Sequence, residues 1–188
     1  MRLVVAPSWS APPPPWLKGR PSVTRETEHV DTLLAHQTDV RGGFGAPSLE
    51  GRIARWMGSG PEHRGVPYHY LYSPRDEAVI ALRHPRVYTY HGNRANRYSV
   101  GFAVDGAWPG DPEHPGLVEE ATELVLAHLA GQRWPVFRLE AHRQHSDQRG
   151  SDPGPELWAP IKRACARRGV VHSSRVTGTG RPVPPEWG

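Results

Sequence analysis

Segments of strand type and segments of helix type alternate along most of this chain, and their order limits the folds that it can adopt. The strand-type segments are rich in β-branched and aromatic residues, and the helix-type segments carry apolar residues at helical spacing. Strands are expected at residues 30–36, 68–73, 78–82, 98–104 and 136–140, and helices at residues 49–57, 117–130 and 157–168. The turn at residues 74–77 makes a hairpin of the second and third strands. We therefore expect an α/β single domain with a central mixed β-sheet flanked by helices.

The two ends of the sequence differ in composition from this middle part. Residues 1–28 are rich in proline, which favours an extended arm without a core of its own. Trp9 and Trp16 lie in this arm, and aromatic residues there indicate docking on the arm's own domain or on a neighbouring partner. Residues 169–188 carry glycine, proline and serine and are expected to form a tail. The domain is therefore placed at residues 29–168.

Composition excludes several classes of protein. The net charge of +4 suits a polyanionic partner, but the basic residues are scattered and no nucleic-acid-binding motif accompanies them, so no nucleic acid is expected. No apolar run approaches the ~20 residues that cross a bilayer, so no membrane span is expected. The first residues are too short an apolar stretch for a secretory signal, which predicts synthesis in the cytoplasm and delivery elsewhere only by another route. Cys165 is the only cysteine and is expected to be a buried thiol.

Two separated segments carry residues of a kind that bind zinc. His142 is followed by a polar loop that ends in Asp152-Pro-Gly-Pro, and His36 ends the apolar run Leu33-Leu34-Ala35. Two imidazoles and one carboxylate leave a fourth tetrahedral position for water, which is the arrangement that a hydrolytic zinc needs.

Four segments of the chain, in order, match one known family. They are Leu34-Ala-His36-Gln-Thr, then Gly65-Val-Pro-Tyr68-His69-Tyr70, then His91-Gly-Asn93 with Asn96-Arg-Tyr-Ser99-Val-Gly101, and finally His142 to Asp152-Pro-Gly-Pro. In this pattern the chain resembles the zinc-dependent N-acetylmuramoyl-L-alanine amidases of the type-2 family. That family includes phage lysozyme-type amidases, recycling amidases and animal peptidoglycan recognition proteins.

The resemblance implies a cell-wall-degrading, endolysin-like function. It implies hydrolysis of the amide between N-acetylmuramic acid and L-alanine, with peptidoglycan or a muropeptide as the partner and Zn²⁺ held by His36, His142 and Asp152. It also implies that Tyr68 donates a hydrogen bond to the tetrahedral intermediate and that His91 contacts the oxyanion or the substrate. A tyrosine packed in the sheet and a hydrogen-bonded loop histidine are the alternatives for these two residues.

The sequence departs from the family pattern at two positions where catalytic help is expected. Ala103 occupies the position of a glutamate, and Gly150 occupies the position of a lysine. Asp105 on the same strand face and Arg149 beside the glycine are imperfect substitutes, because Asp105 lies further along the strand and arginine does not transfer protons.

The remaining histidines are weighed against this site. His145 could compete with His142 as a ligand, but the spacing to Asp152 favours His142. His69 alternates with Tyr68 and is expected on the opposite face of the sheet. The others are expected to be surface or packing residues: His29, His63, His84, His114, His128 and His172.

Two alternatives to an enzyme stay open. The chain could be a non-catalytic peptidoglycan-binding module, or a structural component of a phage tail or injection apparatus, with a docking partner for its proline-rich arm. It could also be an amidase fold recruited to other amide chemistry. In the enzyme, residues 41–47 and 106–116 are expected to wall the substrate groove.

Overall fold

The computed structural model describes residues 1–12, 15, 17, 19–38, 46–58, 60, 62, 64–106 and 115–188. Most of the two loops that we expected to wall a groove, residues 41–47 and 106–116, lies outside this set, as do Trp16, His63 and His114.

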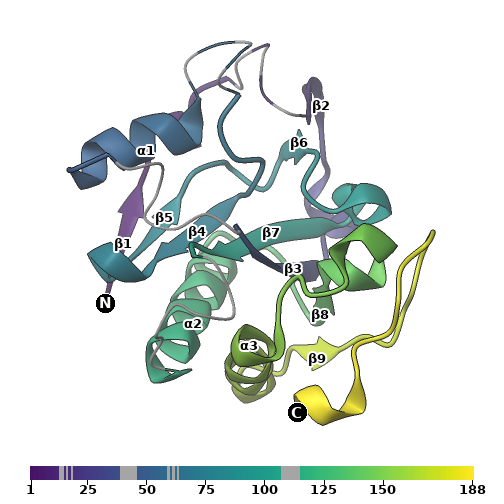
Figure 1. Cartoon of the computed structure of the whole chain (residues 1–188). Coiled ribbons are helices and arrows are strands. Elements are labelled where there is room, and N and C mark those ends of the chain that lie inside the picture. Colours follow the sequence, from purple (N-terminus) through teal and green to yellow (C-terminus); the bar gives the residue numbers. More distant parts are fainter. Residues whose placement is uncertain are drawn as a thin grey trace.

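A mixed sheet forms the centre of the molecule, as the sequence predicts (Figure 1). Its order is β1-β5-β4-β7-β3-β8-β9. The strands are β1 (Arg2–Val5), β3 (Thr32–Gln37), β4 (Tyr70–Ser73), β5 (Ala78–Ala81), β7 (Ser99–Val104), β8 (Arg138–Ala141) and β9 (Val171–His172). The pairs from β4 through β9 are parallel, β5 runs antiparallel to β4, and β1 runs parallel to β5. A separate antiparallel pair consists of β2 (Gly19–Thr24) and β6 (Val87–Thr89).

In the part of the chain that the structure describes, three α-helices cover the sheet. They are α1 (Leu49–Met57), α2 (Pro115–Gly131) and α3 (Pro155–Arg167). Ser48 caps α1 by accepting a hydrogen bond from the Gly51 N–H, and Gly58 ends it with φ of 82°. Short 3-10 helices follow some of the strands and loops, among them η5 (Asn93–Arg97), η6 (His142–Gln144) and η7 (Asp147–Arg149). None of the helices in the described part of the chain has the length and apolar character that a membrane crossing requires.

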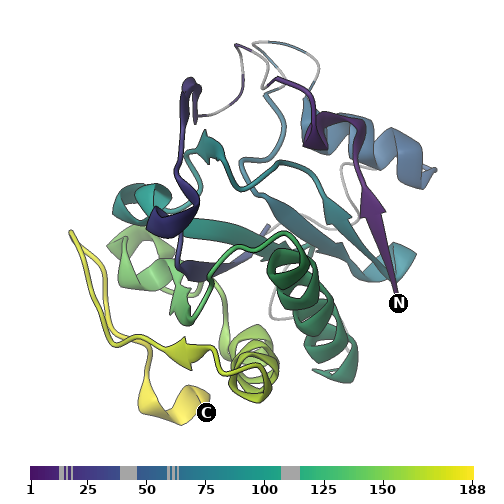
Figure 2. The ribbon, with the colours of Figure 1, turned by 180° about the vertical axis from the view of Figure 1, so that it is seen from behind.

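The helices lie on opposite faces of the sheet (Figures 1 and 2). α2 and α3 pack side by side on one face, which we call the helix-pair face, and α1 lies on the other, which we call the site face. Strand alternation divides the residues between them. Leu33 and Phe102 belong to the larger apolar cluster with α2 and α3, whereas Ala103 belongs to the smaller cluster with Ile53 and Trp56 of α1. His36 alternates with Ala35 and so lies on the site face.

Both terminal segments contribute strands to this sheet. Residues 2–5 of the proline-rich arm form the edge strand β1. Trp9 packs edge-on against Tyr70, with ring centroids 5.5 Å apart, so the arm docks on its own domain at this point. At the other end β9 pairs with β8, and Trp187 packs against the larger apolar cluster.

Candidate metal centre

The ends of two parallel strands bring distant parts of the sequence together. β3 pairs with β8 with Ala35 opposite Ala141, so the residues that follow this pair lie at one edge of the sheet. His36 follows Ala35, and His142 follows Ala141 as the first residue of η6. Asp152 lies between η7 and the start of α3.

His36, His142 and Asp152 form a compact buried group. Nδ1 of His142 lies 2.8 Å from Oδ2 of Asp152 and 3.2 Å from Nδ1 of His36, and the remaining side of the triangle is 3.8 Å. The three residues have exposed fractions of 0, 7 and 3 %. The other oxygen of Asp152 accepts a hydrogen bond from the Gln37 backbone N–H at 2.9 Å, which turns Oδ2 towards the histidines. These three donor atoms could hold one metal ion.

The charges in this group suit metal ligands. Burial lowers the pKa of His36 to about 4, so its imidazole is neutral at pH 7. Burial alone raises the pKa of Asp152, but hydrogen bonds from His142 and His36 outweigh it and hold that pKa well below its usual range. A neutral imidazole and an ionised carboxylate are the forms that bind a cation.

His91 lies behind His36. Its Nδ1 is 3.2 Å from Nε2 of His36, its Nε2 is 3.4 Å from Oγ of Ser99, and Ser99 donates to the Ala95 carbonyl at 2.7 Å. A metal bound at Nδ1 of His36 would leave the hydrogen on Nε2, which faces the Nδ1 acceptor of His91. A methyl group at Gly101 would lie 2.6 Å from Nδ1 of His91, so the glycine makes room for this ring. We expected His91 to contact the oxyanion or the substrate; in the structure both of its ring nitrogens face protein groups.

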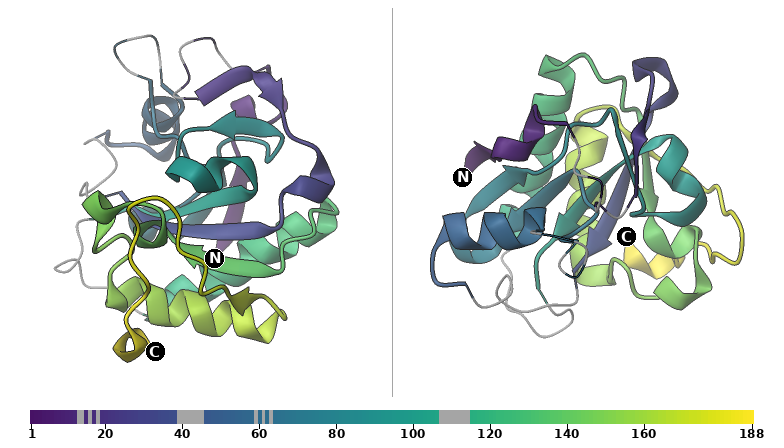
Figure 3. Two further views of the ribbon diagram at one scale, coloured as in Figure 1. Left: turned by 90° about the vertical axis from the view of Figure 1, so that its right-hand side faces the viewer. Right: turned by 90° about the horizontal axis from the view of Figure 1, so that it is seen from above.

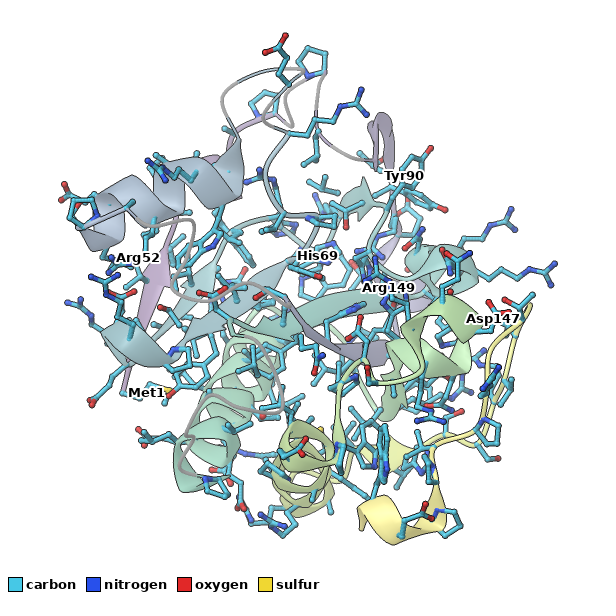
Figure 4. All side chains as sticks on the ribbon, viewed as in Figure 1. Met1, Arg52, His69, Tyr90, Asp147 and Arg149 are labelled. Carbon is cyan, nitrogen blue, oxygen red and sulfur yellow. The ribbon has the colours of Figure 1, made fainter. Side chains whose placement is uncertain are left out.

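Tyr68 and Arg149 lie beside the group. The ring of Tyr68 is half-buried, and its centroid is 4.9 Å from that of His36. It precedes β4, which begins two residues later than the expected strand. Arg149 is the exposed last residue of η7, followed by Gly150, and its charge contributes to the low pKa of His36 (Figure 4).

The position expected for a catalytic carboxylate is directly next to His36. Ala103 of β7 is the register partner of His36, so a side chain there adjoins the ligand group. Alanine cannot transfer a proton. Asp105 lies past the end of β7, where it is buried and accepts a hydrogen bond from the Thr38 hydroxyl at 2.8 Å.

His145, the rival ligand, is turned away from the group. Its Nε2 lies 2.9 Å from Oε2 of Glu140, and its Nδ1 lies 2.8 Å from Oγ1 of Thr177. Both nitrogens are therefore engaged by other side chains, and His142 is the histidine that faces Asp152.

The sequence analysis kept His69 apart from this site, on the sheet face opposite Tyr68, but in the structure it continues the series of neighbouring rings formed by His142, His36 and His91. Nδ1 of His69 accepts from the Gly101 N–H at 3.0 Å, so its neutral ring carries the hydrogen on Nε2, which donates to the Val87 carbonyl at 3.0 Å. Its ring stands perpendicular to that of His91, with centroids 5.1 Å apart. Burial, and then the charge of Arg25, hold the pKa of His69 well below its usual value. The only sequence signal was its position beside Tyr68 in the matched segment.

Arg25 lies at the end of this series of histidine rings, next to His69. Its guanidinium donates to the carbonyls of Asn96 and Ser99 at 2.9 and 2.6 Å, and to that of Pro85. Burial lowers its pKa to about 9, so it remains charged at pH 7. Nothing in the composition of the arm distinguished this arginine, because its partners, three backbone carbonyls and the His69 ring, are far away in sequence.

Comparisons with known proteins agree with the fold. No protein-family model and no curated protein matches this sequence. Among solved structures, N-acetylmuramoyl-L-alanine amidase LysC from Clostridium intestinale URNW has a TM-score of 0.57 and 15% identity, over 89% of this chain and 97% of that chain. Drosophila PGRP-LB has a TM-score of 0.59 and 19% identity, over 86% and 94%. Bumblebee PGRP-SA has a TM-score of 0.60 and 15% identity, over 92% and 98%. This chain therefore has the fold of the amidases and peptidoglycan recognition proteins.

Proposed function

We propose that this chain is a zinc-dependent N-acetylmuramoyl-L-alanine amidase that acts on peptidoglycan or a muropeptide. The observation that carries the proposal is the buried convergence of His36, His142 and Asp152 at the ends of β3 and β8. Zn²⁺ with bonds of ~2.0–2.1 Å to tetrahedral ligands needs ligand atoms about 3.3 Å apart. The three separations of 2.8, 3.2 and 3.8 Å bracket that length.

The substrate class is supported by the fold. One structural neighbour is an amidase by its name, and another is a pair of recognition-protein ectodomains with bound tracheal cytotoxin. The second neighbour has a TM-score of 0.61 and 20% identity, over 86% of this chain and 95% of that chain.

The side chains of this chain have separate roles in the proposed reaction. When bound, zinc supplies a Lewis acid that activates water near neutral pH and polarises the scissile carbonyl. Asp152 and the two histidines would hold it, and His91 would accept the Nε2 hydrogen of His36 and leave Nδ1 free to bind the metal. Tyr68 donates its phenol hydrogen bond to the developing oxyanion, and Arg149 contributes a positive charge at the rim.

Proton transfer is the weak part of this site. With Ala103 beside His36, no carboxylate at that position accepts a proton from the attacking water. General base catalysis contributes about 10²–10⁴ in rate where it operates. We therefore expect slow turnover.

The same observation supports a second candidate, a metal-containing module that binds peptidoglycan without cutting it. Several structural neighbours are recognition proteins by name. Both candidates need the cell-wall partner, and they differ in whether the amide is hydrolysed.

One experiment separates the two candidates. The purified chain and its His142→Ala variant are analysed for zinc by elemental analysis and are incubated with sacculi, and released peptides with free L-alanine amino termini are quantified. One zinc per chain and peptide release by the wild type alone supports the amidase. Zinc and sacculus binding without release supports the binding module. A chain that neither holds zinc nor binds sacculi overturns both.

A further inference from the structure

The loop that carries His142 has little regular structure of its own. It consists of the two short turns η6 and η7, and it connects β8 to α3. Figure 3 shows the C-terminal segment, drawn in yellow, running alongside these turns. Figure 4 shows Asp147 of η7 at the point where the two segments meet. We call residues 173–181 the C-terminal strap.

Gln144 joins the strap to the end of β8. Its side-chain amide donates to the carbonyls of Ser173 and Arg175 at 2.7 and 2.9 Å, and its backbone carbonyl accepts from the Thr177 N–H at 2.9 Å. The side-chain oxygen of the same glutamine accepts from the Ala141 N–H at 2.8 Å. Ala141 directly precedes His142, so Gln144, with three hydrogen bonds to the strap and one to Ala141, connects the strap to the backbone beside a ligand.

The strap also approaches the loop closely by its backbone. The Arg181 N–H donates to the Arg143 carbonyl at 2.8 Å. A Cβ atom on Gly180 would collide with the carbonyl of Gln144, so a glycine is required at this crossing. Thr179 adds a hydroxyl bond of 2.9 Å to the Asp147 carboxylate of η7.

A buried charged network lies under this contact. Glu140 on β8 is fully buried and accepts from His145 on one oxygen and from Arg175 of the strap on the other, at 2.9 Å each. Thr177 engages the second nitrogen of His145 at 2.8 Å. A buried carboxylate is stable only with its partners in place. The strap thus supplies two of the side chains that hold the loop against β8.

We propose that the C-terminal strap is a positioning element of the metal centre, which holds the η6–η7 loop so that His142 faces Asp152 and His36 before zinc arrives. The inference rests on the metal binding in the proposed function. The sheet fixes His36 directly, whereas the loop that carries His142 is held by residues 173–181 together with Glu140 of β8 and Asn93 of η5, which donates to the His145 carbonyl at 3.2 Å. A site held in advance loses less conformational freedom on binding, so the strap contributes to zinc affinity.

The test uses variants of the full chain. Thr177→Val replaces the hydroxyl bonded to His145 with a methyl group of similar size, and Gly180→Ala introduces the collision with Gln144. Val176→Ala is the matched control, because Val176 lies in the strap with a side chain that is 40% exposed. For each chain the zinc dissociation constant is measured by competition with a chelator, below the melting temperature of the zinc-free protein. The visible spectrum of the Co²⁺-substituted chain is recorded as a report of coordination geometry.

We expect Thr177→Val to raise the zinc dissociation constant by up to about tenfold, because the hydroxyl holds the loop through His145 and acts on the ligand His142 only indirectly, and Gly180→Ala to raise it further. The cobalt spectrum should change in both variants and stay unchanged in Val176→Ala. A lower melting temperature of the zinc-free variants with an unchanged dissociation constant and spectrum would mean that the strap only stabilises the fold, and the inference would be wrong. If Gly180→Ala does not fold, Thr177→Val decides alone. A wild-type chain that binds no zinc overturns the proposed function and this inference together.

Discussion

The two faces of the sheet are built from the same strands but contain different chemistry. On the helix-pair face, Leu33, Ala35 and Phe102 join a large apolar cluster with α2 and α3. On the site face, the alternate residue His36 begins a series of buried rings that continues with His91 and His69, and Ala103 lies beside His36. β3 and β7 therefore contribute to the large apolar cluster on one side and adjoin the metal centre on the other.

This difference has an energetic consequence. Burial of apolar side chains stabilises the fold, whereas burial of polar groups costs free energy unless every group is paired. Glu140, the register partner of Leu34, lies on the site face and needs both His145 and Arg175. We therefore expect substitutions on the helix-pair face to change the free energy of unfolding, and those on the site face to change metal binding and catalysis.

The largest effect is expected from the loop ligand. His142→Ala removes a metal ligand on the site face, and amide hydrolysis should fall by at least ~10³-fold, since the Lewis acid contributes several kcal/mol to transition-state stabilisation. Release of peptides from sacculi and zinc content measure the result. His172→Ala, which changes an exposed histidine, is the control. Retained zinc and full activity in His142→Ala would mean that the metal centre does not lie on this face of the sheet.

On the helix-pair face, Phe102→Ala should lower the free energy of unfolding by about 3–5 kcal/mol, because the ring is fully buried and leaves a cavity. Urea unfolding of the zinc-free chain measures this change. The zinc dissociation constant of the folded variant should stay within about twofold of the wild-type value, since additivity holds for sites without shared partners. A loss of zinc affinity as large as the loss of stability would show that the two faces are not independent.

The sequence predicted the architecture because the spacing of apolar residues along the chain differs between helices and strands. The apolar spacing gave helix α1 with its bounds, and the hairpin of β4 and β5 followed from the turn at residues 74–77. It also predicted three residues that the structure brings within 4.8 Å of one another, His36, His142 and Asp152. That grouping rested on matched segments and not on spacing alone.

What the sequence did not indicate depends on contacts between distant segments. β6 is three residues long, too short for a periodic signal, and β1 lies in a segment that looked like an arm. Arg25 has backbone carbonyls as hydrogen-bond partners, and Gln144 reaches the strap through carbonyls too. Backbone groups have no residue type, so no pattern of letters reveals these contacts.

A smaller effect, confined to catalysis, is expected at Tyr68. Tyr68→Phe keeps the ring that lies beside His36 and removes only its hydroxyl, so kcat/KM should fall by about 10²-fold, the usual loss for one oxyanion donor, while the zinc dissociation constant stays unchanged. Tyr90→Phe, at a tyrosine that is 42% exposed, is the control. Unchanged kinetics in Tyr68→Phe would assign this ring to packing and leave the site face without an identified oxyanion donor.

The smallest effect is expected behind the ligand, and it tests how far the site face extends into the molecule. His91→Ala leaves the Nε2 hydrogen of His36 without its acceptor, and zinc affinity should fall by about tenfold, because outer partners fix the orientation of a ligating ring. His91→Gln supplies an acceptor oxygen in the same place and should restore most of that affinity. His128→Ala is the matched control from the helix-pair face, where His128 bonds the Tyr70 hydroxyl at 2.9 Å and should not influence zinc. Equal losses in the alanine and glutamine variants would mean that the ring of His91 only fills space beside Gly101, because a packing role depends on shape and is not restored by a hydrogen-bond acceptor.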